Sequence, residues 1–92
     1  MAAAAPVRFT LRLVNKLPTS RVVVLEPWTG EYQLAASSAL DIAVEGSPKT
    51  PLGIELDGDR IIVYSFDTTD AMLTAYRDGK ELKSEHRLPP AG

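Results

Sequence analysis

Every second residue from position 7 to position 13 is apolar, and the residues between them are charged or hydroxylated. Successive side chains of a strand point to opposite faces, so this two-residue period predicts a half-buried strand. Residues 1–6, which precede the alternation, are interpreted as a flexible N-terminal segment. Residues 15–20 include a proline, an asparagine and two hydroxylated residues, and this composition predicts a turn that ends the strand.

Two segments that follow have the pattern of a hairpin. Residues 21–26 are a β-branched run that is apolar on both faces, which is typical of a central strand or one covered on both sides. After a turn at 27–30 the alternation resumes at 31–35, so the two segments are expected to pair. A further half-buried strand is predicted at 40–45, where apolar residues again alternate with polar or small ones.

A second hairpin is predicted after a surface loop at 46–51, which contains two prolines and a glycine. Residues 52–56 and 60–66 alternate on either side of Asp57-Gly58-Asp59, a sequence that is typical of a tight turn between strands.

The segment 71–77 admits two interpretations. Met72, Leu73 and Tyr76 have helical spacing, and Thr69 could cap a helix. However, the run is short and ends at Asp78-Gly79, the dipeptide that two-residue hairpin turns prefer. We therefore favour a terminal hairpin formed by 71–77 and 80–83 over a helical turn.

The chain of 92 residues predicts one domain. About seven short strands joined by hairpin-length turns indicate an all-β fold, a small antiparallel β-sandwich or barrel-like domain spanning 7–83. Residues 84–92 are interpreted as a polar C-terminal tail. A chain of this length buries only about 60–65% of its unfolded surface, so its core is thin and self-association is a plausible way to bury more.

A short segment resembles a known family. Val24-Leu25-Glu26-Pro27-Trp28 precedes Glu31-Tyr32, and Ile62-Val63-Tyr64 and Tyr76-Arg77-Asp78-Gly79-Lys80-Glu81-Leu82 come later. This arrangement over roughly 8–82 resembles a family of small uncharacterised bacterial all-β proteins with a Leu-Glu-Pro-Trp segment before an acidic–aromatic pair. The resemblance implies a compact β domain and a strand at 71–77, and it implies no activity.

Composition narrows the function classes. The formal charge of −2 leaves no general basic face, so no nucleic-acid partner is expected, and Arg8, Arg12, Arg21 and Arg60 are interpreted as parts of a solvated sheet face. The chain has no cysteine, which excludes disulfides, thiolate nucleophiles and cysteine-based zinc sites and favours a reducing, cytoplasmic setting. The N-terminal residues resemble neither a signal peptide nor a membrane span.

No catalytic residue, cofactor or metal site is predicted. The single histidine, His86, lies in a charged tail segment and is interpreted as a surface residue, and the chain contains no Gly-x-Ser-x-Gly elbow or phosphate-binding glycine loop. Asp57 and Asp59, with Asp67 and Asp70 at a later strand end, carry the hard oxygen ligands that calcium prefers, but Asp57-Gly58-Asp59 also suits a hairpin turn for backbone reasons alone.

Two aromatic and two acidic residues form the candidate ligand-binding patch: Trp28, Tyr32, Glu26 and Glu31. An exposed indole and phenol with carboxylates nearby would suit sugar stacking or a protein contact. The alternative, which we favour, is that Trp28 folds back and plugs one end of the thin core while both glutamates remain solvated.

These observations predict a non-enzymatic β domain that works by binding protein, including a second copy of itself. The alternative is a small-ligand or carbohydrate-binding module that uses the patch around Trp28 and Tyr32.

Overall fold

The computed structural model describes residues 5–83, which form eight strands and, within that range, no helix. The strands are β1 (Val7–Asn15), β2 (Arg21–Glu26), β3 (Gly30–Leu34), β4 (Ser38–Gly46), β5 (Gly53–Asp57), β6 (Arg60–Tyr64), β7 (Met72–Arg77) and β8 (Lys80–Glu81). The all-β prediction is confirmed, and the segment 71–77 contains a strand rather than a helical turn. Of the predicted N-terminal segment 1–6, residues 1–4 lie outside the described residues. The predicted tail 84–92, which includes His86, lies outside them as well.

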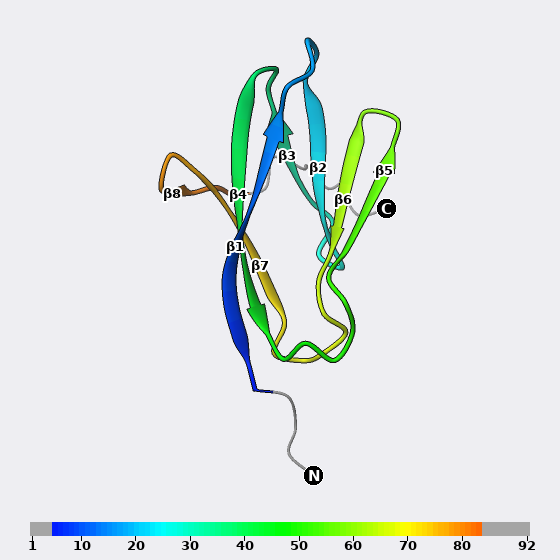
Figure 1. Ribbon diagram of the computed structural model, residues 1–92, viewed down its shortest axis with the longest axis vertical. Coiled ribbons are helices and arrows are strands. Elements are labelled where there is room, and N and C mark those ends of the chain that lie inside the picture. Colours follow the sequence, from blue (N-terminus) through cyan, green and yellow to red (C-terminus); the bar gives the residue numbers. More distant parts are fainter. Residues whose placement is uncertain (1–4, 84–92) are drawn as a thin grey trace, which may run out of the picture.

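The strands form two four-stranded sheets that pack on each other (Figure 1). The first sheet has the order β1-β4-β7-β8 and the second has the order β3-β2-β6-β5. Every pair is antiparallel except β2 and β6, which are parallel. This one pair departs from the expected antiparallel arrangement, because the chain passes through β4 in the first sheet before it returns to the second.

The three predicted hairpins are present: β2–β3, β5–β6 and β7–β8. Each turn contains a residue with positive φ, and in the last of them both Asp78 and Gly79 have it, at 52° and 79°. Two successive positive φ values characterise the type I′ turn, whose twist matches that of the strands it joins. The local turn chemistry therefore produces the hairpins that the sequence predicts.

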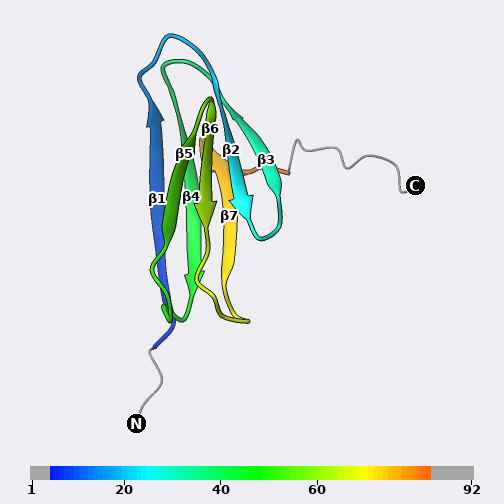
Figure 2. The ribbon, with the colours of Figure 1, turned by 90° about the vertical axis from the view of Figure 1, so that its right-hand side faces the viewer.

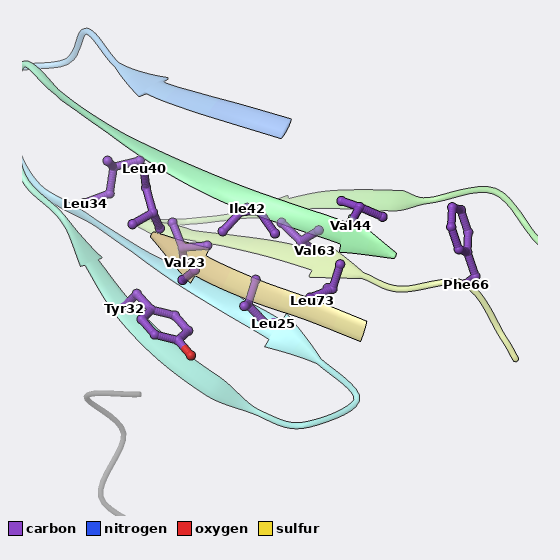
Figure 3. Close-up of a cluster of buried hydrophobic side chains, with 11 residues drawn as sticks. Val23, Leu25, Tyr32, Leu34, Leu40, Ile42, Val44, Val63, Phe66 and Leu73 are labelled. Carbon is purple, nitrogen blue, oxygen red and sulfur yellow. The ribbon is translucent and has the colours of Figure 1, made fainter. Parts of the chain in front are cut away.

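The core lies between the two sheets and is almost wholly aliphatic. Figure 3 shows side chains from both sheets pointing toward one another. The fully buried residues come from five strands, namely Val23, Leu25, Leu34, Leu40, Ile42, Val44, Val63 and Ala75. Phe66, which follows β6 and is only 5% exposed, lies at one end of this cluster (Figure 3).

β1 pairs with β4 along its whole length, from Val7 opposite Gly46 to Asn15 opposite Ser38. Leu11 and Leu13 lie opposite core residues of β4, so the odd-numbered positions of β1 face inward. The even positions face outward, where two ion pairs join the strands. Arg8 lies 3.5 Å from Glu45, and Arg12 donates two hydrogen bonds to Asp41 at 2.7 and 3.0 Å.

Candidate functional site

Trp28 lies in the β2–β3 turn and is 46% exposed. The expectation that it plugs the core is therefore wrong. The turn carries the indole outside the space between the sheets, and the buried ring of Phe66 closes one end of the core instead. Trp28 is consequently available as a contact surface.

The structure divides the predicted patch between three places. Tyr32 is 8% exposed and lies opposite Val23 on the inward face of β3, within the core cluster. Glu31 precedes it and has the opposite orientation, with its Oε2 atom 3.5 Å from the Arg60 guanidinium. Only Glu26 and Trp28 remain together, because a strand alternates its faces and the turn separates Trp28 from β3.

Glu26 and Trp28 line a groove of about 360 Å³ at the end of the second sheet. The opposite side of the groove comes from the segment after β6 and from Tyr64, which lies beside Glu26 in the parallel pair. The sequence pattern predicts a strand that contains Tyr64, but it does not connect Tyr64 to Trp28. Tyr64 and Trp28 come together because β2 pairs with β6 in parallel, and no local sequence motif encodes that pairing.

The groove is electronegative on its tyrosine side. The Tyr64 hydroxyl donates a hydrogen bond of 3.0 Å to Oε1 of Glu55. This bond, together with desolvation and the charges of Glu55, Glu26 and Asp57, raises the pKa of Tyr64 above its ordinary value. A flat indole beside carboxylate acceptors suits neutral, hydroxyl-rich molecules and disfavours anions.

A second feature of the surface is an apolar margin between the edge strands β1 and β5, which we call the open side. Ile54 and Leu56 of β5 lie opposite Val63 and Ile61 of β6, so their side chains are on the inward face, yet they are 49% and 78% exposed. Phe9, on the inward face of β1, is 42% exposed. The core-facing side chains of both edge strands are therefore incompletely covered.

The arrangement of the strands explains this exposure. β5 pairs only with β6, and Figure 1 shows the β5–β6 hairpin at one side of the molecule and β8 at the other. Near the turn of this hairpin a hollow of about 250 Å³ separates it from the end of β1. Residues of β5, β6 and the β1–β2 loop line the hollow together with the end of β1, among them Leu17, Leu56 and Ile61.

The four arginines do not form a single strip. Arg8 and Arg12 lie on the first sheet and contact acidic residues of β4, whereas Arg21 and Arg60 lie on the second. Arg21 donates to the Thr19 hydroxyl and the Ser20 carbonyl, and Arg60 contacts Glu31. The positive charges are thus distributed over two sheets and compensated locally at Arg8, Arg12 and Arg60.

Within residues 5–83, no group of three or more histidine or acidic side chains is placed to hold a metal ion. Asp57 and Asp59 flank Gly58 in the β5–β6 turn, where the Asp59 carbonyl accepts a hydrogen bond of 2.9 Å from the Val22 amide. None of the described segments forms a helix with the length and hydrophobicity of a membrane span.

Comparisons of this chain with protein-family models, with curated proteins and with solved structures found no match. The resemblance to the bacterial family with a Leu-Glu-Pro-Trp segment stays a prediction.

Proposed function

We propose that this protein is a non-enzymatic binding domain that associates with another polypeptide through its open side. The observation that carries the proposal is the exposure of Phe9, Ile54 and Leu56, side chains that alternation directs toward the core. The lack of cysteine favours a cytoplasmic setting for this association.

The energetics favour a protein partner. Single exposed hydrophobic residues are common on any protein, but a group of them along one margin is typical of an interaction surface. Complete burial of a large aliphatic or aromatic side chain contributes about 1.5–3 kcal/mol. Phe9, Ile54 and Leu56 are already partly buried, so covering their exposed parts would offset a fraction of the entropy that association costs. The backbone edge of β1 offers further hydrogen-bonding groups to a partner.

Photo-crosslinking tests this proposal. A benzoylphenylalanine in place of Leu56 should form a covalent adduct with a polypeptide when the protein is expressed in its host and irradiated. The matched control is the same substitution at Lys80, which is exposed on β8 at the other side of the molecule. Adducts at both positions, or at neither, would contradict association through the open side.

The groove beside Trp28 supports a second candidate function, the binding of a neutral carbohydrate. An exposed indole can stack on a sugar ring, and Glu26 supplies a hydrogen-bond acceptor in the same groove. Because Trp28 is the only tryptophan, its fluorescence reports on this site alone. Titration with neutral oligosaccharides should shift the emission of the protein, and Glu26→Gln should weaken that response. An emission that no oligosaccharide changes would leave only the protein-binding function.

A further inference from the structure

We propose that the polypeptide bound at the open side is a second copy of this chain, and that the two copies pair through their β1 strands. This inference rests on the proposed function and names its partner. Within residues 5–83, the strands at the ends of the two sheet orders are β1, β3, β5 and β8. β1 has nine residues, whereas the other three have five, five and two.

β1 carries Arg8 and Arg12 on its outward face, but it lacks three other features by which edge strands avoid pairing. Such strands are usually interrupted by proline or a bulge, or carry an inward-pointing charge. β1 contains no proline or glycine, and its register with β4 is continuous over all nine residues. Its inward positions before Asn15 are Val7, Phe9, Leu11 and Leu13, none of which is charged. Figure 2 shows β1 at the margin of the molecule, with the β2–β3 hairpin at the opposite margin.

The sequence of β1 selects one antiparallel register. A two-fold axis perpendicular to the sheet keeps inward faces together only if one residue of β1 lies directly opposite its own copy, with the axis midway between them. Leu11 is the midpoint of β1, so an axis at Leu11 is the one that pairs all nine residues. Leu11 then meets Leu11 of the second copy, and Phe9 meets Leu13.

The charges agree with the same register. With the axis at Leu11, Arg8 lies opposite Val14 of the second copy and Arg12 lies opposite Thr10, so every arginine faces an uncharged residue. An axis at Thr10 would place Arg8 directly opposite Arg12, and like charges at that position destabilise a sheet. Because Glu45 and Asp41 already compensate the two arginines within each copy, pairing brings no unbalanced charge together.

Single cysteines test the register directly, since the natural chain has none. Residues that face each other in an antiparallel pair have Cα atoms about 4.5–5.5 Å apart, within the range that a disulfide spans. Leu11→Cys should therefore form a disulfide-linked dimer under mild oxidation. Phe9→Cys is the matched control on the same face. It should stay unlinked, because Phe9 lies opposite Leu13 of the second copy and the two cysteines would be four residues apart along the strand. A mixture of Phe9→Cys and Leu13→Cys should link the two variants to each other.

A charge series provides a second measurement that does not alter the core-facing side. Thr10 is exposed on the outward face, so Thr10→Lys would lie opposite Arg12 twice per dimer and Thr10→Glu would complement it. The dissociation constant measured by sedimentation should rise roughly two- to thirty-fold for Thr10→Lys and fall for Thr10→Glu.

The expected result is a species of twice the 10.0 kDa chain mass that links at Leu11→Cys and not at Phe9→Cys. A dimer that links equally at both positions or at neither would overturn the β1 interface. So would a chain that sediments as a monomer at hundreds of micromolar. In these cases a photo-crosslinked adduct at position 56 with a different protein would leave the proposed function in place.

Discussion

Asn15 is buried although its side chain is polar, because its amide is held by hydrogen bonds. Its Nδ2 atom donates to the carbonyl oxygens of Thr19, Leu34 and Ala35 at 2.9, 3.1 and 3.3 Å. Its Oδ1 atom accepts a hydrogen bond of 3.0 Å from the Leu17 amide. The residue thus joins the loop after β1 to the end of β3.

Replacing Asn15 with alanine should lower the free energy of unfolding by about 1–3 kcal/mol, because partners are left unpaired where water has little access. Urea denaturation followed by circular dichroism measures this loss. Lys16→Ala, a change at an exposed neighbouring residue, should stay within about 0.5 kcal/mol of the natural protein. Equal effects of the two substitutions would contradict the role assigned to Asn15.

Phe66, rather than the expected Trp28, is the aromatic residue that closes one end of the core. Phe66→Ala should destabilise the protein by about 3–5 kcal/mol, the usual cost of removing a buried aromatic ring. Trp28→Ala should cost less than about 1 kcal/mol, because nearly half of the surface of Trp28 is already exposed. Chemical denaturation monitored by circular dichroism compares the two variants, and a larger loss from Trp28→Ala would refute the placement of both rings.

Between the elements, Gly46 allows β4 to approach the segment before β7. Its φ is +138°, and a Cβ atom added there would lie 2.8 Å from the Ala71 Cα atom. Gly46→Ala should therefore destabilise the protein by roughly 1–3 kcal/mol through backbone strain and displacement. Gly53→Ala is the matched control, since its nearest neighbour would be the Tyr64 Cβ atom at an ordinary 3.5 Å. A thermal melt in which both variants behave alike would argue against the close approach.

The loops after β4 and β6 are held together by Asp70. Its carboxylate accepts hydrogen bonds from the Ser47 hydroxyl at 2.7 Å and the Ser47 amide at 3.1 Å, and these bonds lower the pKa of Asp70. A carboxyl whose pKa is lower in the folded state stabilises the fold above its unfolded pKa, and this contribution disappears as the pH falls through the folded value.

Asp70→Asn should consequently lower the melting temperature at neutral pH. The difference from the natural protein should shrink as the pH falls below about 4, where an unfolded aspartate begins to bind its proton. Thermal melts recorded from pH 7 to pH 2 measure this difference. A difference that stays constant over that range would show that the charged carboxylate contributes nothing.

The hairpins are the part of the fold that local sequence encodes. Asp78-Gly79 and the glycine of Asp57-Gly58-Asp59 supply the positive φ values that tight turns require, and the alternation of β5 and β6 follows directly from their residues. The pairing of β1 with β4 and of β2 with β6 could not be predicted in this way. Alternation shows which side chains turn inward, but it does not identify the neighbouring strand.

The same limit applies to the candidate site. Glu26 and Trp28 are near in sequence and remain together, whereas Tyr64 joins them only through the parallel pair. Tyr32 is near Trp28 in the sequence, yet the alternation of β3 directs it into the core. The exposure of Leu56 depends on the position of β5 relative to the first sheet. The pattern of apolar residues in β5 alone does not encode that position.

At the scale of the whole molecule, the two small sheets of residues 5–83 enclose a thin core and leave the margin between β1 and β5 incompletely covered. The uncovered residues come from both sheets, so no rearrangement of a single strand explains them. A margin of this kind combines apolar side chains with the free backbone edge of β1, and the two together suit the addition of another strand.

Amide hydrogen exchange along β1 tests this account most directly. Alternate amides of residues 7–15 point away from β4, and they can be protected only if another strand pairs with them. We expect these amides to be protected at high protein concentration and to exchange faster on dilution, while those that face β4 remain slow. Exchange of the outward-pointing amides at the rate of exposed loop amides, unchanged by concentration, would contradict the account.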